Sequence, residues 1–262
     1  NSIILYNNSV DIFSCLEDIS IMGILIALII IFTWFFHLSY MFVYLEPSFT
    51  SVTFYIHILL QVYLYTGLFI TAHDSMHRTV SKNKTINKLV GQISTFLYAG
   101  LSYNRLIKNH FKHHKTPGSE NDPDYNIKSQ NFFIWWGSFM IRYATIWQLL
   151  IMAAAFNILK IYVPEINLWF FWVIPAILSS MQLFYFGTYL PHKQPHTHEM
   201  EPHKARTQKK NHLWAMISCY FFGYHFEHHE SPQTPWWRLY QSKWYITCLR
   251  NIFIMEKRYL YK

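Results

Sequence analysis

Long apolar stretches limit how this chain can fold more than any other feature of its sequence. Two of them, Ile21–Leu45 and Leu168–Leu190, are long enough to cross the ~30 Å hydrocarbon core of a bilayer as helices. Val52–Ala72 and Tyr143–Val163 are more polar but of similar length. Because 52% of the residues are hydrophobic and only 14% are charged, too little polar sequence is left to cover four such helices in water. We therefore predict an all-α integral membrane protein with four transmembrane helices.

Short connections predict how these four spans pair. Glu46–Ser51 joins the first span to the second, and Pro164–Asn167 joins the third to the fourth. Loops this short imply antiparallel neighbours, so the spans form two hairpins. The two longer polar segments are expected to form a helical cap. No linker or internal repeat divides the sequence, and residues 1–262 are expected to form a single domain.

Lys and Arg are distributed very unevenly along the chain. Residues 78–142 carry ten of the 22, residues 193–262 carry eleven, and Lys160 is the last. By the positive-inside rule, the two large polar segments lie on the cytoplasmic or equivalent side of a bacterial inner membrane or a plastid membrane. This basic face suits contact with anionic lipid or docking of an acidic electron carrier. The positive charge is too widely spread among apolar helices to indicate binding of nucleic acid.

Eight histidines form three clusters beside the predicted spans. The clusters are H-D-S-M-H (His73, His77), H-F-K-H-H (His110, His113, His114) and H-F-E-H-H (His225, His228, His229). Positions i, i+3 and i+4 share one face of a helix, so each cluster can point its imidazoles the same way. Eight nitrogens are too many for one tetrahedral zinc and suit two metal ions, for which imidazole ligation fits iron, zinc or copper. The sequence therefore predicts a di-metal site near the membrane interface.

A ninth histidine is a candidate for the same site. His192 follows the fourth span directly, as His73 follows the second, so the two are expected to lie at the same depth. An ordinary loop histidine after Pro191 is the alternative. The spans themselves contain only His37 and His57, which are expected to be packing or interfacial residues.

Several carboxylates lie in or close to the histidine clusters. Asp74 lies between two candidate ligands, and Glu227 lies within the third cluster. A ligating histidine needs an acceptor for its other ring N–H, and we expect these two carboxylates to provide it. Asp122 and Asp124 are expected instead to shape a turn around Pro123.

The three histidine boxes resemble those of the membrane fatty-acid desaturase and hydroxylase superfamily, and several stretches resemble the bacterial-type β-carotene ketolase family within it. These stretches are A-H-D-S-M-H at 72–77, N-H-F-K-H-H-K at 109–115, D-P-D-Y at 122–125, F-G-T-Y-L-P-H at 186–192, F-F-G-Y-H-F-E-H-H-E at 221–230 and P-W-W-R-L at 235–239. The resemblance implies a membrane non-haem di-iron monooxygenase. It also implies two iron ions, dioxygen, an external electron donor such as a ferredoxin, and a carotenoid substrate from the bilayer.

The activity implied by this resemblance is β-carotene 4-ketolation. Two successive hydroxylations of the methylene at carbon 4 of a β-ionone ring give a gem-diol, which loses water to leave a ketone. β-Carotene would yield echinenone and canthaxanthin, and zeaxanthin would yield astaxanthin. A carotenoid ring hydroxylase or an acyl-lipid desaturase or hydroxylase would use the same site. A membrane metal carrier is the non-enzymatic alternative, disfavoured because the candidate ligands lie outside the spans.

The sequence departs from this family at three positions near the boxes. Arg78 stands where the family usually has Gly, and Phe221 stands where it commonly has His. Phe226 stands where a different polar or aromatic residue is often found. None of these departures removes a box histidine. Arg78 is expected to narrow the substrate pocket or to change its electrostatic field.

Overall fold

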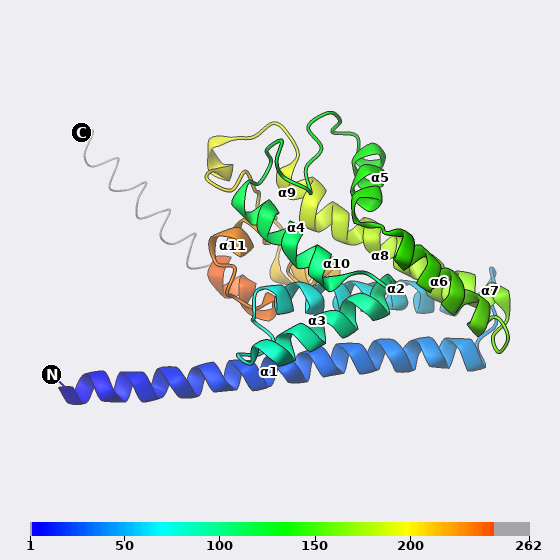
Figure 1. The fold of residues 1–262 in the computed structure, drawn as a ribbon, viewed down its shortest axis with the longest axis horizontal. Helices are drawn as coiled ribbons and strands as arrows, with labels where there is room; N and C mark the ends of the chain where they lie inside the picture. Colours follow the sequence, from blue (N-terminus) through cyan, green and yellow to red (C-terminus); the bar gives the residue numbers. More distant parts are fainter. Residues whose placement is uncertain (1, 244–262) are drawn as a thin grey trace.

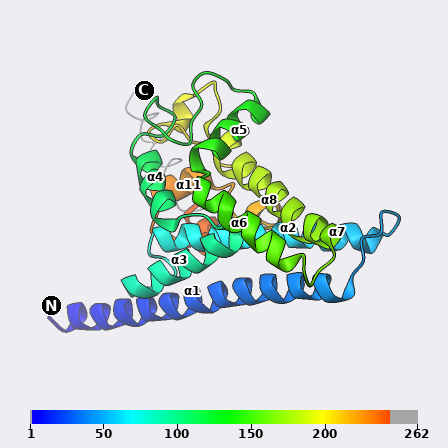
Figure 2. The ribbon, with the colours of Figure 1, turned by 45° about the vertical axis from the view of Figure 1, so that its right-hand side comes forward.

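The structure, a computed structural model, describes residues 2–243, with side chains from Ser20 onward. Within this range every regular element is a helix, in agreement with the predicted all-α class. The longer helices are α1 (Ser2–Tyr44), α2 (Val52–Met76), α3 (Lys84–Ala99), α4 (Tyr103–Lys115), α5 (Phe132–Tyr143), α6 (Ile146–Leu159), α8 (Ile174–Phe184), α10 (His212–Cys219) and α11 (His225–Glu230). Figures 1 and 2 show α1 and α2 side by side, with α4 and α11 far from the short helix α7 (Glu165–Leu168).

Helix α2 is the central element and packs against α1, α3 and α8. Its second half is enclosed, and Tyr65, Leu68 and Ile70 have no exposed surface. A side-chain hydrogen bond also joins α2 to α8, since Thr66 Oγ1 donates to Gln182 Oε1 at 2.6 Å. Such bonds between helices provide partners that the bilayer core does not offer. The helices that lead to His73 and to His192 are thereby held in a fixed relation.

Apolar side chains cover the outer surfaces of α1 and α6. On α1, Ile29, Phe32 and Phe36 each expose more than half of their surface, with fractions of 64%, 53% and 64%. Helix α6 is apolar and has no buried residue. Extended apolar surface of this kind is unusual on a soluble monomer and is what a helix in contact with lipid presents.

The last long helix is continuous but irregular. It runs through α7, a π-helical turn at Trp169–Val173, α8, a second π-helical turn at Tyr185–Tyr189, and α9 (Leu190–His192). Together these segments form 28 residues, Glu165–His192, long and apolar enough to cross a membrane. Ser20–Tyr44 and Val52–Met76 meet the same condition. These three helices match the predicted first, second and fourth spans.

The predicted third span, Tyr143–Val163, is interrupted. Tyr143 ends α5, Ala144 is extended with ψ of 142°, and the Thr145 side chain caps α6 by accepting a hydrogen bond from the Gln148 backbone. The two helices meet at 90°. The 14 residues of α6 extend about 21 Å, short of the ~30 Å core. This pair is a broken span or a re-entrant loop, so four spans in two hairpins stays a prediction.

The predicted single domain, residues 1–262, includes residues 1 and 244–262, which lie outside the described part of the chain. Within residues 2–243, α2 touches helices from both halves of the sequence. The single-domain organisation stays a prediction.

Gly91 marks a close approach of α3 to its neighbours. A Cβ at this position would lie 2.2 Å from Tyr103 Cε2 and 2.3 Å from Ser75 Oγ. We expect Gly91→Ala to push α3 away from α2 and to lower the free energy of unfolding by about 1–3 kcal/mol, as overpacking usually does. The measurement is the thermal unfolding midpoint in detergent. Gly137→Ala is the matched control, because its Cβ would meet nothing within 4 Å; equal midpoints would contradict the prediction.

Candidate metal centre

Four separate elements bring the candidate ligands together. His73 lies in the last turn of α2 and His77 directly follows that helix. The second box lies in α4, the third in α11, and His192 ends α9. Helices α2 and α8 are packed together and both run away from the end where α7 lies (Figure 1), so the residues that follow them lie at the same end of the structure. The nine histidines predicted as ligands therefore meet in one region.

The first group consists of His73, His77, His110 and His228. Each offers one ring nitrogen, and the four nitrogens lie within 4.8 Å of one another. Nε2 of His77 and Nε2 of His110 are only 2.6 Å apart. Both ring nitrogens of His73 are buried without a hydrogen-bond partner among the described residues. Lone pairs this close repel unless a proton or a cation lies between them, so the arrangement fits a metal ion.

The second group consists of His113, His192, His225 and His229, all of them buried. Nε2 of His229 lies 3.1 Å from Nε2 of His113 and 3.1 Å from Nε2 of His225. Neighbouring ligands bound about 2.1 Å from one ion have roughly this separation.

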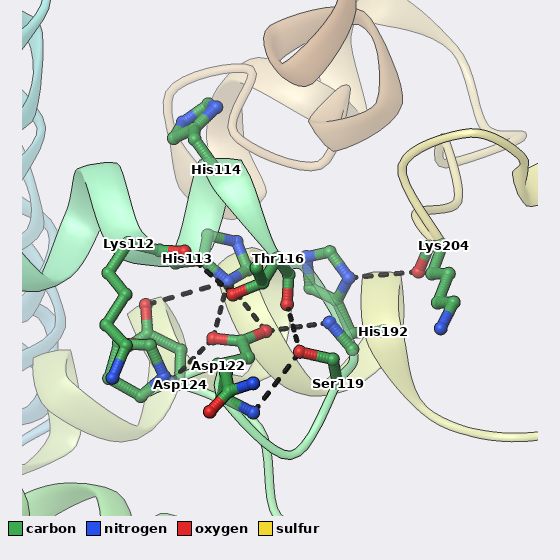
Figure 3. Close-up of polar contacts among 12 residues, drawn as sticks. Lys112, His113, His114, Thr116, Ser119, Asp122, Asp124, His192 and Lys204 are labelled. Atoms are coloured by element: carbon green, nitrogen blue, oxygen red, sulfur yellow. Dashed lines mark hydrogen bonds and ion pairs between the residues drawn. The ribbon is translucent and has the colours of Figure 1, made fainter.

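His192 is part of this group through a defined hydrogen bond. Its Nδ1 donates to the Lys204 carbonyl oxygen at 2.9 Å (Figure 3). The lone pair is thereby left on Nε2, which is buried and has no hydrogen-bond partner within the described part of the chain. The structure thus brings the predicted ninth candidate into position, and ligation by His192 remains our proposal.

His114 lies between the two groups and belongs to neither. Its Nε2 is 2.9 Å from Nε2 of His228. The centre of its ring is 4.5 Å from that of His110 and 4.3 Å from that of His229. Figure 3 shows His113 and His114 turned to different sides of α4. The predicted role of His114 as a ligand stays a prediction.

Burial keeps most of these imidazoles unprotonated. It lowers the pKa of His77 to about 4 and that of His114 to about 2, where neighbouring histidines add to the effect. Burial also lowers the pKa of the other box histidines that follow the spans, His110, His225, His228 and His229, well below the usual value. At neutral pH these imidazoles are therefore neutral, and their nitrogen lone pairs are available. Metal ligation requires this neutral form.

Asp122 holds His113 in place, a role that the sequence analysis did not assign to it. His113 Nδ1 donates to both carboxylate oxygens of Asp122 at 3.0 Å (Figure 3). Burial lowers the pKa of His113, but the charge of Asp122 and this hydrogen bond outweigh it and raise the pKa. The carboxylate also accepts the backbone N–H groups of Gly118 and Asp124 at 2.8 Å, so the expected turn is present as well. With Nδ1–H engaged, Nε2 of His113 faces the other histidines.

The two carboxylates that were expected to support the ligands, Asp74 and Glu227, are both buried. Asp74 Oδ1 lies 3.7 Å from His73 Nδ1, longer than a hydrogen bond. Its Oδ2 accepts the Trp236 backbone N–H at 3.0 Å and so ties the P-W-W segment to α2. Glu227 is buried in α11. That either carboxylate accepts a hydrogen bond from a ligating imidazole stays a prediction.

A cavity of about 110 Å³ is lined in part by the histidines. Members of both groups face it, namely His73, His110, His113 and His225. The remaining wall is mostly apolar and aromatic, including Phe69, Met76, Leu101, Leu106, Phe139, Met140, Leu183, Phe184 and Phe222. The corner between α5 and α6 contributes Tyr143, Ala144 and Gln148. A small apolar group of a larger molecule can therefore approach both metal groups from one side.

The three departures from the family pattern, Arg78, Phe221 and Phe226, do not line this cavity. Arg78 has φ of 60°, in the left-handed region that favours glycine, which explains why Gly suits this position. Its side chain is exposed and does not line the cavity, so the expected narrowing is not seen. Phe221 also has φ of 60°, and its ring packs against Tyr224 and Trp236.

The family to which the chain belongs follows from comparison with known families. The model of the fatty acid desaturase family matches residues 47–163 and 132–247, which include all three boxes and His192. The chain belongs to the fatty acid desaturase family. No solved structure matches it.

Curated relatives place the chain in the predicted ketolase branch of that family. It is 40% identical to zeaxanthin 4-ketolase from Chlamydomonas reinhardtii over 182 residues, 68% of this chain and 41% of the relative. It is 38% identical to β-carotene 4-ketolase 3 from Haematococcus lacustris over 68% of this chain and 58% of the relative. A β-carotene ketolase from Paracoccus sp. (strain PC1) is 36% identical over 69% of this chain and 75% of the relative. The chain thus spans about half the length of the two algal relatives.

Asp122→Asn tests the support of His113. The amide oxygen can still accept a hydrogen bond from Nδ1–H, but the negative charge is lost. We expect iron affinity to fall by about tenfold, the lower end of the effect usual for such partners. The measurement is iron retained by purified protein during titration with a chelator. Glu120→Gln, an exposed change in the same loop, is the control; equal retention in both variants would show that Asp122 does not support the site.

Proposed function

We propose that this protein is a β-carotene 4-ketolase, a membrane di-iron oxygenase that converts the methylene at carbon 4 of a β-ionone ring to a ketone. The observation that carries the proposal is the mostly apolar cavity that is lined by members of both histidine groups. The ketolase relatives supply the substrate class, a carotenoid. β-Carotene, giving echinenone and canthaxanthin, is the proposed substrate, and zeaxanthin is a further one.

The nine histidines would hold two iron ions, one in each group, with His114 between them. Bound iron would supply the activation of dioxygen. The chain supplies two things, neutral imidazoles and a pocket that holds little water. Neutral imidazoles leave the positive charge of the ions largely uncompensated. A ferredoxin is the proposed source of electrons. We place the histidines on the cytoplasmic or equivalent side of the membrane, because Lys and Arg concentrate in the same segments.

The cavity wall accounts for reaction at one carbon of a long substrate. A carotenoid is a rod comparable in length to the ~30 Å hydrocarbon core, so only its terminal ring need enter. Phe139, Leu183 and Phe184 would pack against the ring and exclude water. While the ring stays in the cavity, carbon 4 remains next to the histidines for two successive reactions. The first hydroxylation gives an alcohol, the second gives a gem-diol, and loss of water gives the ketone.

A carotenoid ring hydroxylase is the second candidate, since it needs the same centre and the same ring pocket. It would stop after one hydroxylation, and its products would carry hydroxyl groups. An acyl-lipid desaturase or hydroxylase would also use the centre, but the ketolase relatives favour a carotenoid ring.

Expression in a bacterium that accumulates β-carotene tests the proposed function. We expect echinenone and canthaxanthin in pigment extracts analysed by chromatography. His228→Ala removes one nitrogen of the first group, so we expect it to abolish both ketone formation and most of the bound iron. Hydroxylated carotenoids in place of ketones would favour the ring hydroxylase. Unchanged β-carotene, with iron-loaded protein and a working donor, would overturn the carotenoid assignment.

A cavity variant separates substrate binding from metal binding. Ala144 lies at the corner between α5 and α6 and lines the cavity. Ala144→Trp should fill the space with a large ring and reduce ketone formation by more than about tenfold, since overpacked side chains are poorly accommodated. Its iron content should remain close to that of the wild type. Full activity in this variant would show that the substrate ring does not use this cavity.

A further inference from the structure

A second concave surface lies beside the histidines. It is formed by α4, the loop that follows α4, and the end of α5. Its exposed cations are Arg105, Lys112 and Arg142, and its one exposed carboxylate is that of Glu120. Arg105 and Lys112 are seven residues apart and therefore lie two turns apart on one face of α4. We call this surface the basic groove.

The basic groove is one hydrogen bond away from a proposed iron ligand. Asp122 contributes to its wall, and the same carboxylate accepts the Nδ1–H of His113 at 3.0 Å. Two residues further on, Asp124 lines the substrate cavity, where it accepts a hydrogen bond from the Tyr143 hydroxyl. The loop from Asp122 to Asp124 thus has the groove on one side and the cavity on the other.

The guanidinium groups of the basic groove are held in place. Arg142 Nη1 donates to the Pro123 carbonyl oxygen, and Arg105 Nη2 donates to the Arg142 carbonyl oxygen. Both side chains are exposed, and a guanidinium binds carboxylates well. The groove therefore presents preorganised positive charge close to His113.

We infer that the basic groove is the docking surface for an acidic one-electron carrier of the ferredoxin type, which delivers electrons along Asp122 and His113. This inference rests on the proposed function, because each hydroxylation uses one dioxygen, two electrons and two protons. One oxygen atom enters the substrate and the other leaves as water. The carrier is oxidised by one electron at each of two dockings. Opposite charges on carrier and groove steer the encounter and set the register.

Anionic lipid is the other partner that basic residues attract. A concave surface with fixed guanidinium groups suits the carboxylates of a folded protein better than a flat layer of headgroups. Lys84 and Lys88, exposed in the first turns of α3, lie at the far end of that helix from α4. Replacing these two lysines changes the net charge of the protein by the same amount as replacing two cations of the basic groove, and so provides a matched control.

The first test measures binding alone. The probe is an oxidised plant-type ferredoxin, and the protein is held in phosphatidylcholine nanodiscs, which carry no net headgroup charge. At low ionic strength we expect Arg105→Glu/Lys112→Glu to raise the dissociation constant at least about tenfold, and salt to weaken wild-type binding. Lys84→Glu/Lys88→Glu, with the same change in net charge, should alter it less than about threefold.

Three outcomes of the binding test would overturn the inference. In the first, both double variants weaken ferredoxin binding equally. In the second, the wild type does not bind ferredoxin. In the third, the groove variant binds ferredoxin as the wild type does but binds anionic lipid vesicles more weakly. The third would assign the basic residues to lipid instead.

Turnover with β-carotene then separates the inference from the proposed function. We expect the groove variant to raise the half-saturating ferredoxin concentration by a similar factor, with kcat at saturation and the KM for carotenoid unchanged. Groove-dependent binding without any ketone product would leave the docking surface standing and defeat the ketolase assignment. If the groove variant forms ketones and needs no more ferredoxin than the wild type, the ketolase assignment stands and the docking surface is wrong.

Discussion

The mutual approach of buried, unprotonated imidazoles is the interaction on which the rest of the structure depends. Elements from both halves of the chain, α2, α4, α9 and α11, each contribute rings to one region. A buried polar group without a partner costs about 1–3 kcal/mol, and several ring nitrogens here have none among the described residues. Shared cations would turn this cost into a stabilising contribution, since metal binding is coupled to folding. Apolar packing alone explains the bundle of α1, α2, α3 and α8, but not why the histidine-bearing segments meet.

Loops between the helices decide which ring nitrogen faces inward. Asp122 takes the Nδ1–H of His113, and the Lys204 carbonyl takes the Nδ1–H of His192. Each bond selects the tautomer that leaves Nε2 free for a metal. The segments that follow α4 and α9 are therefore part of the centre, although neither contains a histidine box. Their polar partners lie outside the apolar spans, where hydrogen bonding to backbone groups is easily satisfied.

Local sequence patterns predicted the main helices and the clustering of the boxes, because both depend on spacing along one chain segment. Apolar length indicated four spans, three of which are membrane-length helices in the structure, and i, i+3 and i+4 spacing indicated shared faces within each box. Asp122 was assigned only to a turn, since its pairing with His113 depends on how the loop folds back on α4. The break at Ala144 was missed for a similar reason. The apolar run continues through it, while the cap formed by Thr145 interrupts the helix without interrupting hydrophobicity.

The π-helical turn at Tyr185–Tyr189 shows why the detailed shape of the site could not be predicted. A π turn adds a residue to the helix and rotates everything after it, and such turns are frequent at functional sites. No residue pattern in F-G-T-Y-L-P-H announces it. Gly187 lies within this turn, and a Cβ there would lie 2.1 Å from Phe222 Cε1. Phe222 in turn packs against His73 and His225, with ring centres 4.8 Å and 5.3 Å apart. Because Gly187 has no side chain, the segment that carries the third box can approach α2. The cavity wall and the metal centre therefore form at the same contact.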